Sequence, residues 1–384
     1  MVIRDGRKKL KQLSANFKAV AVVGPRQSGK TTLVKTLFDK KPYVSLENPD
    51  TLRFALEDPR GFLAGFPKGA ILDEVQRAPQ LFSYLQEILD NSSRKGHFIL
   101  TGSNNFILQE NISQTLAGRI GYLQLLPFSI GELDDAGKLP ASDDSLMLKG
   151  FYPPVYQQRI PASDWCPNYI RTYIERDIRQ LKNISDLARF EKFLALLAGR
   201  CSQELNMNAL SVEAGIDLKT VQSWIGLLEN SFIIYQLKPH FKNYNKTVVK
   251  RPKIYFFDTS LVCSLLRITS VNHLVNHPLR GAIFECLVVS EFMKQRANTG
   301  QSPNLYYWRD KTGHEIDLIV DTAGKLLPIE IKSGNTVTSE FFKNLSYWNE
   351  LSGVKKSLLL YAGDSKQKRS SGTDVWPWRE YLLK

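Results

Sequence analysis

Cysteine is scarce in this 384-residue chain, and long apolar runs are missing from it. The four cysteines lie far apart and form no CxxC pair, which argues against a zinc site and fits a reduced cytoplasm. No run of about 18 apolar residues is present, so we expect no membrane span. The basic N-terminal stretch is followed only by the short AVAVV, which does not predict a signal peptide. The cysteines are Cys166, Cys201, Cys263 and Cys286.

Acidic residues are also in deficit. The chain has 51 Lys and Arg against 38 Asp and Glu, a net charge of +13 and a pI near 9.4. This balance favours a polyanionic partner such as nucleic acid, although a merely basic surface would give the same composition. The length allows two or three domains, each with its own core.

A glycine-rich segment, GPRQSGKTT, follows a short apolar run and precedes a helical pattern. Gly24-x4-Gly29-Lys30-Thr31 therefore stands where a phosphate-binding loop stands, between a strand and a helix N-terminus. Lys30 is expected to reach the β- and γ-phosphates of a nucleotide, and the Thr31 hydroxyl to bind Mg²⁺. The predicted nucleotide-binding residues are Gly24, Pro25, Arg26, Gln27, Ser28, Gly29, Lys30, Thr31, Thr32 and Asp73.

Polar residues end the next two predicted strands. GAILDEVQRAP ends its apolar run in Asp73 and Glu74, where Asp73 is expected to hold the magnesium and Glu74 to act as general base on water. An acidic turn after an ordinary strand is the alternative. HFILTGSNN places Asn104, or else Asn105, to contact the γ-phosphate or the lytic water. Asparagine is also common in plain turns.

Arg119 precedes a further predicted strand in TLAGRIGYLQLL. It is a candidate arginine finger on the nucleotide of a neighbouring subunit, which would make the protein a homo-oligomer. A structural arginine is an equally open interpretation.

These motifs, together with LAGRI and YIRTYIERDI, resemble a group of bacterial and archaeal AAA-like ATPases. In that group an ATPase module precedes a C-terminal domain of long-unassigned function. The resemblance covers nearly the whole chain and implies a parallel sheet with the Walker A, Walker B and sensor strands side by side.

The middle of the chain is predicted to contain a lid or linker at 131–187 and a winged-helix-like domain at 188–258. A helix, a short helix, a turn at Gly215 and a longer helix from Asp217 give the helix-turn-helix order. Two β-rich runs then flank a basic tip without acids, which is suited to phosphate contact. Packing or oligomer contact is the alternative. The basic residues of this wing are Lys238, Lys242, Lys246, Lys250, Arg251 and Lys253.

Near the C-terminus, HEIDLIV and LLPIEIKSG place Asp317 on one strand and Glu330 and Lys332 on the next. Side chains alternate along a strand, so Glu330 and Lys332 share a face. Two carboxylates and an ammonium on one patch suit Mg²⁺ bound by Asp317, Glu330 and the carbonyl of Ile331. Lys332 would then orient or deprotonate the attacking water, and Glu285 on the preceding helix would complete the metal shell.

This pattern resembles the PD-(D/E)xK nuclease fold, whose core is a helix followed by three strands, although here the Asp follows Ile316 rather than Pro. A salt-bridged patch without metal is the alternative.

The predicted fold class is therefore α/β. A P-loop parallel sheet at 1–130 precedes the lid, the winged-helix-like domain and a restriction-endonuclease-like domain at 259–384. The predicted function is ATP hydrolysis coupled to action on nucleic acid, with DNA preferred, by a cytoplasmic protein that needs ATP and Mg²⁺. The alternative is an ATP-driven regulatory switch whose nuclease-like domain does not cleave.

Overall fold

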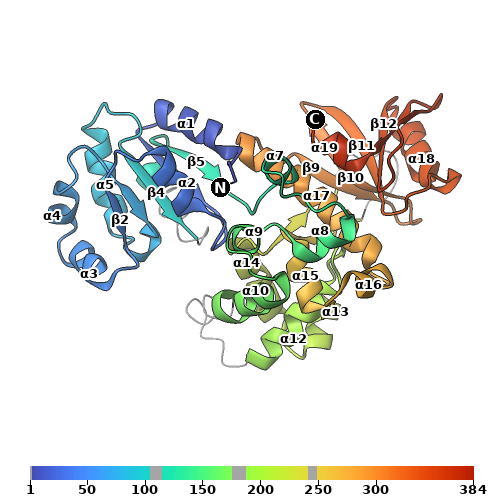
Figure 1. Cartoon of the computed structure of the whole chain (residues 1–384), viewed down its shortest axis with the longest axis horizontal. Helices are drawn as coiled ribbons and strands as arrows, with labels where there is room; N and C mark the ends of the chain where they lie inside the picture. Colours follow the sequence, from blue (N-terminus) through green and yellow to red (C-terminus); the bar gives the residue numbers. More distant parts are fainter. Residues whose placement is uncertain (1, 104–114, 175–186, 241–248) are drawn as a thin grey trace.

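The computed structural model describes residues 2–103, 115–174, 187–240 and 249–384. Three sheets with their helices follow one another along the chain (Figure 1). The first lies at one end of the molecule and the last at the other, and a mainly helical region lies between and below them in this view. None of the helices in the described ranges is both long and apolar enough to cross a membrane.

The N-terminal sheet has five parallel strands in the order β2-β3-β4-β1-β5. Strand β4 therefore lies between β1, which leads into the glycine-rich loop, and β3, which ends in Asp73. This confirms the predicted parallel sheet and its three adjacent strands. The strands are β1 (Ala19–Val23), β2 (Tyr43–Ser45), β3 (Ile71–Asp73), β4 (Phe98–Gly102) and β5 (Ile120–Gln124).

Helices cover this sheet, because apolar strands of a parallel sheet need both faces buried. All five residues of β1 are buried, as are all five of β4. Parallel strands end together at one edge, so the loop after β1 and the carboxylates after β3 meet there. The helices are α1 (Gly6–Asn16), α2 (Lys30–Leu37), α3 (Pro49–Glu57), α4 (Pro59–Ala64) and α5 (Leu81–Asp90).

The segment predicted as a lid or linker is packed more closely than that name implies. Helices α8 and α10 contact α15 (Thr259–Leu265), although about a hundred residues separate them in sequence. The Thr259 hydroxyl donates to the carbonyl of Met147 at 2.8 Å, and Asp258 accepts from the N–H of Phe151 at 2.7 Å. The segment contains α7 (Ile130–Asp135), α8 (Asp143–Lys149), α9 (Pro153–Gln157), α10 (Ala162–Tyr169) and the π-helical Ile170–Ile174.

The described residues 187–240 and 249–256 form three helices and a small antiparallel sheet in the order β6-β8-β7. Asp217 caps the third helix by accepting from the N–H of Thr220 at 2.9 Å, as its place in the sequence predicted. Gly215 ends the second helix at φ +70°, a left-handed turn that favours glycine. The elements are α12 (Leu187–Ala198), β6 (Gln203–Glu204), α13 (Met207–Ala214), α14 (Leu218–Asn230), β7 (Ile234–Leu237) and β8 (Lys253–Phe256).

The C-terminal sheet is mixed, with six strands in the order β13-β14-β12-β11-β10-β9. The long helix α17 (Arg280–Thr299) contacts β11 and also α1 and β5, so it links this sheet to the N-terminal part. Glu291 of α17 also accepts from the N–H of Ile130, the first residue of α7, at 2.8 Å. The other elements are α16 (Val271–Val275), β9 (Leu305–Arg309), β10 (Glu315–Thr322), β11 (Lys325–Lys332), α18 (Lys343–Ser352), β12 (Ser357–Tyr361), β13 (Gln367–Lys368), β14 (Thr373–Pro377) and α19 (Trp378–Leu382).

Candidate functional site

The loop between β1 and α2 has a backbone path that its glycines permit. A Cβ on Gly24 would lie 2.0 Å from the carbonyl oxygen of Leu125, so only glycine fits against β5. Gly29 has φ +90°, which L side chains rarely adopt, and it turns the chain into the first residue of α2. The loop therefore curls over the N-terminus of a helix, where backbone N–H groups and the helix dipole favour an anion.

Lys30 points back into the curve of this loop. Its Nζ donates to the carbonyls of Gly24 at 2.9 Å and Pro25 at 2.8 Å, and the side chain is buried. Burial lowers the pKa of the Lys30 ammonium, while the charges of Glu74 and Asp73 oppose that effect. The lysine thus occupies the position from which a phosphate loop contacts phosphate oxygens.

Asp73 gathers three hydroxyls at the end of β3. Thr31 Oγ1 donates to its carboxylate, with 3.1 Å to Oδ2 and 3.2 Å to Oδ1. The Tyr43 hydroxyl donates to Oδ2 at 2.6 Å, and the Thr101 hydroxyl donates to Oδ1. A hydroxyl and a carboxylate in contact at the mouth of the loop are oxygen ligands of the kind that Mg²⁺ prefers.

Glu74 follows directly in a left-handed backbone conformation, at φ +55°. Its Oε2 accepts from the Ser103 hydroxyl at 2.8 Å and from the side-chain amide of Gln76. Burial acts to raise the pKa of the Glu74 carboxyl, but the charge of Lys30 and these hydrogen bonds outweigh it and hold the pKa below its ordinary value. The carboxylate is therefore ionised at neutral pH, and its strained backbone is typical of functional positions.

The remaining loop residues are tied to segments far away in sequence. Gln27 accepts from the indole N–H of Trp165 at 2.9 Å, and Arg26 lies 3.5 Å from Glu47. The guanidinium of Arg4 donates to the carbonyl of Ser28 at 2.5 Å. Pro25 and Thr32 flank these positions, and the Ser28 hydroxyl is buried with no partner among the described residues.

Of the remaining predicted residues, Arg119 is not brought to the loop. Asn104 and the alternative Asn105 lie outside the described residues. Arg119 precedes β5 at the edge of the sheet opposite the loop, where its carbonyl accepts from the N–H of Ala19. Its guanidinium pairs with Asp90 of the same chain, with Nη2 at 3.0 Å from Oδ2. Arg119 therefore cannot act on the nucleotide of its own chain, and the role on a neighbouring subunit stays a prediction.

Sequence reasoning missed several contacts of this site. Arg4, Tyr43 and Trp165 lie in segments without a recognisable motif, so no local signal pointed to them. Thr101 and Ser103 lie within LTGSNN, and their position at the end of the strand between β1 and β3 was the available signal.

The C-terminal trio converges as predicted. Lys332 Nζ lies 2.6 Å from Glu330 Oε1 and 4.0 Å from Asp317 Oδ2. The pairing of β10 with β11 ends at Leu318, and β10 is irregular against β9 between Ile316 and Ile319. Asp317 therefore lies just beyond the regular ladder, and its carboxylate accepts from the N–H of Ile331 at 2.8 Å. Irregularities of this kind commonly aim side chains at active sites.

The charges of the trio are only partly balanced. Burial and the neighbouring charge of Asp317 raise the pKa of the Glu330 carboxyl to about 8, and its Oε2 has no hydrogen-bond partner in the described structure. Burial acts to lower the pKa of Lys332, but Asp317 and Glu330 raise it above its ordinary value. Lys332 therefore stays cationic and cannot serve as the base that deprotonates water in this state.

Glu285 is committed to a separate network. Its Oε1 accepts from Lys253 at 2.9 Å and from the Tyr255 hydroxyl at 2.5 Å, and Lys253 also pairs with Glu315. Burial raises the pKa of Glu285 to about 7. Among the described residues no three His, Cys, Asp or Glu side chains are grouped closely enough to hold a metal ion, so the predicted set of Glu285, Asp317 and Glu330 is not assembled.

Lys253 also corrects the predicted wing. It is buried in β8 with 2% of its surface exposed, because its ammonium is neutralised by two carboxylates. It is unavailable for phosphate contact. Lys238, Lys250 and Arg251 are exposed, and Lys242 and Lys246 lie outside the described residues.

Comparison with protein families divides the chain into three parts. Residues 16–134 match a family described as AAA domain, residues 143–272 match Domain of unknown function (DUF8612), and residues 280–381 match Domain of unknown function (DUF4143). The AAA match contains the loop, Asp73 and Glu74, so the predicted AAA-like P-loop ATPase domain is confirmed. The nuclease-like assignment of the C-terminal part stays a prediction, since the description there gives no function.

Two solved structures show partial similarity to the chain. The Walker-type ATPase PABY2304 of Pyrococcus abyssi is 15% identical, with 69% of this chain and 95% of that chain covered and a TM-score of 0.45. AMPPCP-bound DnaA from Aquifex aeolicus is 14% identical, with 58% and 85% covered and a TM-score of 0.30. At these TM-scores neither structure defines the fold of the whole chain.

Two mycobacterial sequences are similar over most of the chain. Uncharacterized protein Mb2031c of Mycobacterium bovis and uncharacterized protein Rv2008c of Mycobacterium tuberculosis are each 32% identical over 339 residues. The alignment spans 87% of this chain and 74% of each relative. The chain belongs to the family of these two proteins, and its N-terminal part is an AAA-type P-loop ATPase domain.

Proposed function

We propose that the protein binds and hydrolyses ATP at the loop of residues 24–32, with Mg²⁺ held by Thr31 and Asp73. The contact between the Thr31 hydroxyl and the Asp73 carboxylate, directly beside the inward-pointing Lys30, carries this proposal. This contact supports the proposal, because a cation and two oxygen ligands lie beside a helix N-terminus, where the β- and γ-phosphates of a nucleotide would lie. When bound, Mg²⁺ supplies charge neutralisation to the phosphate oxygens.

Glu74 is the proposed general base. Its ionised carboxylate is fixed by Ser103 and Gln76, and it lies next to the residue that would hold the metal. A carboxylate held in this way accepts a proton from water and orients it for attack on the γ-phosphate.

Hydrolysis of [γ-³²P]ATP by the full chain, measured with Mg²⁺ and with EDTA, tests the proposal. Absence of Mg²⁺-dependent phosphate release would overturn it.

We further propose that the protein acts on nucleic acid, with DNA preferred, through residues 188–384. The helices and small sheet of 187–256 have the order of a winged helix, and Lys238, Lys250 and Arg251 are exposed beside that sheet. Helix α17 followed by β9, β10 and β11 has the order expected of a nuclease-like core. The net charge of +13 supports the same partner.

Phosphodiester cleavage at Asp317, Glu330 and Lys332 is proposed as the activity of this part. Supporting it are the convergence of the three side chains and the unpartnered, buried oxygen of Glu330, which a divalent cation would satisfy. Since the third predicted carboxylate, Glu285, is bound to Lys253, only two carboxylates would hold the ion. Lys332, being cationic, would contact the phosphate rather than remove a proton.

A second candidate is an ATP-driven switch whose C-terminal domain contacts a partner without cutting it. The ion pairs of Glu285 with Lys253 and of Glu330 with Lys332 favour this candidate, because both carboxyl groups already have cationic partners. Incubating plasmid DNA with Mg²⁺ or Mn²⁺, with and without ATP, separates the two. Cleavage that is lost in both Asp317→Ala and Lys332→Ala supports the nuclease. No cleavage by the wild type, with DNA retained in a gel-shift assay, supports the switch.

We also propose that the protein forms oligomers, because Arg119 could reach a nucleotide only on a neighbouring chain. Its pairing with Asp90 would have to exchange for that contact. Sedimentation of the full chain with and without an ATP analogue tests this. A monomer under both conditions would exclude the arginine-finger role.

A further inference from the structure

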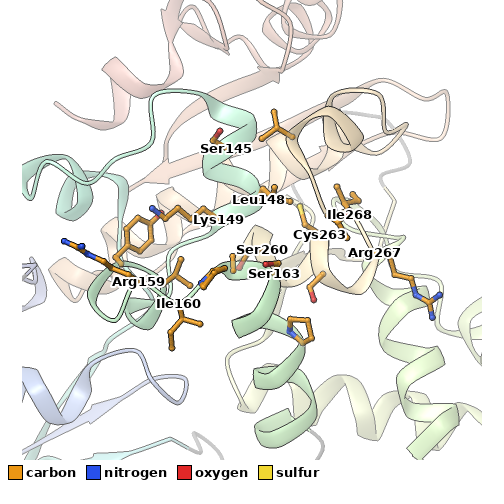
Figure 2. A pocket seen from close by; sticks show the side chains of 18 of the residues that line it. Ser145, Leu148, Lys149, Arg159, Ile160, Ser163, Ser260, Cys263, Arg267 and Ile268 are labelled. Carbon is orange, nitrogen blue, oxygen red and sulfur yellow. The ribbon is translucent and has the colours of Figure 1, made fainter.

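A cleft of about 940 Å³ lies in the helical middle of the molecule, away from the two sites described above (Figure 2). It is bounded by the end of α8, by α9, by the turn into α10, by α15 and by the residues that follow α15. Its size is at the upper end of the range of about 300–1,000 Å³ that small-molecule sites occupy. Nothing in the proposed ATPase or nuclease chemistry uses it.

The lining combines an apolar floor with basic side chains. Leu148, Ile160, Cys263 and Ile268 contribute apolar surface, and no Asp or Glu is found among the described residues of the lining. In Figure 2, Lys149 and Arg159 lie toward one end and Arg267 toward the other, with Leu148 and Cys263 between them. The basic residues of the lining are Lys138, Lys149, Arg159 and Arg267.

None of these four cations forms an ion pair with a carboxylate within the described ranges. Lys138 donates to the carbonyl of Tyr156 at 3.1 Å, and Lys149 Nζ lies 4.4 Å above the Tyr156 ring. Burial lowers the pKa of Lys149, and the like charge of Lys138 adds to this effect. An anion entering this end of the cleft would relieve the repulsion between the two ammonium groups.

The two arginines occupy positions where glycine is usual. Arg159 has φ +58° and Arg267 has φ +57°, and each follows the last turn of a short helix, α9 and α15 respectively. After α15 the N–H of Arg267 donates to the carbonyl of Ser264 and that of Ile268 to Cys263, which closes the helix in the manner that favours glycine or asparagine. The sequence therefore accepts backbone strain twice and places an arginine on the cleft each time.

We propose that this cleft binds a small amphipathic anion, a molecule with a carboxylate or phosphate group on an apolar body. The anionic group lies toward Lys149 and Arg159, and the apolar body lies along Leu148, Ile160 and Cys263. A polyanion such as nucleic acid is a poorer fit, because the floor of the cleft is apolar. A neutral ligand would gain no ionic attraction from the four cations.

Helix α10 connects the cleft to the phosphate loop. Ser163 and Pro167 line the cleft, while Trp165 of the same helix donates to Gln27 and the Tyr169 hydroxyl donates to the carbonyl of Arg26 at 3.4 Å. A ligand in the cleft and a nucleotide in the loop would therefore both influence the position of α10. This part of the proposal rests on the proposed nucleotide binding, and linkage requires the effect to be reciprocal.

Titration calorimetry of the full chain without nucleotide, using octanoate, octyl phosphate, octanol and octyltrimethylammonium, tests the site directly. We expect the two anions to bind at least about tenfold more tightly than octanol, and the cation not to bind. The carboxylate and phosphate arms tell which head group is preferred. Equal binding of octanol, or no binding of either anion, would overturn the proposal.

Arg159→Gly and Arg267→Gly separate the site from the fold. Glycine relieves the left-handed backbone, so each variant should keep or raise the Tm. The affinity for the preferred anion should fall about fivefold or more in Arg159→Gly, which removes a cation at the head-group end, and by less in Arg267→Gly at the opposite end. Ala323→Gly, at φ +53° in the turn between β10 and β11, is the matched control and should leave affinity unchanged. An Arg159→Gly variant that binds the anion like the wild type would overturn the proposal.

A second titration measures the coupling. Octanoate at saturation should change the affinity for a non-hydrolysable ATP analogue, and the analogue should change the affinity for octanoate by the same factor. Trp165→Phe removes the hydrogen bond to Gln27 and should reduce that factor without abolishing either ligand's binding. Unchanged affinities in both directions would exclude the coupling. Failure of the analogue to bind at all would instead contradict the proposed nucleotide site.

Discussion

The hydroxyl of Thr31 lies 3.1 Å from the Oδ2 atom of Asp73, and this contact joins the first turn of α2 to the end of β3. These two strand-to-helix segments are separated by forty-two residues in sequence, yet the parallel order of β3, β4 and β1 ends them at one edge. The contact therefore results from sheet topology. It also indicates which hydroxyl and which carboxylate would share the proposed metal ion, and so which variants should act alike.

Thr31→Ala should lose Mg²⁺-dependent ATP hydrolysis by tenfold or more, equivalent to about 1.4 kcal/mol, because alanine cannot supply the hydroxyl ligand. Thr31→Ser retains the hydroxyl and should retain most of the activity. Thr36→Ala is the matched control, since Thr36 is an exposed threonine of the same helix whose hydroxyl donates to the carbonyl of Thr32. Steady-state phosphate release measures all three.

Glu74→Gln should separate binding from hydrolysis. The amide preserves the shape and can still bond to Ser103, but it cannot accept a proton from water, so kcat should fall by about 10²–10⁴ while ATP affinity is maintained. Glu57→Gln, at the exposed end of α3, should change neither quantity. Single-turnover hydrolysis and fluorescent-ATP titration distinguish the two effects. A fall in affinity equal to the fall in kcat would contradict the role of base.

Arg4 is the contact that fixes the loop from the N-terminal side. It is 6% exposed, pairs with fully buried Glu132 at 2.9 Å and also donates to the carbonyl of Ser28. Arg4→Ala leaves the Glu132 charge buried and unpaired, so it should lower the free energy of unfolding by about 3–5 kcal/mol. Arg7→Ala, at an exposed position of α1, should change it little. Chemical denaturation measures both, and a double change to Arg4→Met and Glu132→Leu should recover part of the loss.

Site residues that belong to a local sequence motif could be predicted. GPRQSGKTT, the Asp73-Glu74 pair and the D…ExK pattern each combine a short β run with its neighbours, and the structure brings each set together. The order of β3, β4 and β1 was predicted from the family resemblance and not from the motifs, because strand order is a property of the whole sheet.

Contacts made across long distances in sequence were not predictable in this way. Lys253 was expected on a basic wing, because its sequence neighbours are basic, but the partners that bury it lie on α17 and β10. Glu285 was assigned to a metal because its helix precedes the strands of Asp317 and Glu330. The helix was predicted correctly, but its pairing with Lys253 was not. Trp165 approaches Gln27 only because α10 packs beside the loop. A single sequence carries no pattern for such pairs.

The raised pKa of Glu330 predicts how stability depends on pH. In the unfolded chain this carboxyl loses its proton near its ordinary pKa of 4.5, whereas in the folded chain it keeps the proton until about pH 8. Between these values the unfolded state binds fewer protons, so the free energy of unfolding contributed by Glu330 falls as pH rises. The penalty is absent below about pH 4.5 and complete above about pH 8.

Glu330→Gln removes this penalty, so its Tm should equal that of the wild type near pH 5 and exceed it by at least about 2 °C at pH 8.5. Glu285, whose pKa is raised to about 7, is present in both proteins and contributes a decline of the same sign in each. Glu350→Gln, on the exposed face of α18, should follow the wild type at every pH. At pH 8.5 added Mn²⁺ should raise the Tm of the wild type and not of Glu330→Gln, because only the ionised carboxylate attracts the ion. A Tm difference that does not grow with pH would show that Asp317 and Lys332 already balance the charge of Glu330, and no metal would then be needed there.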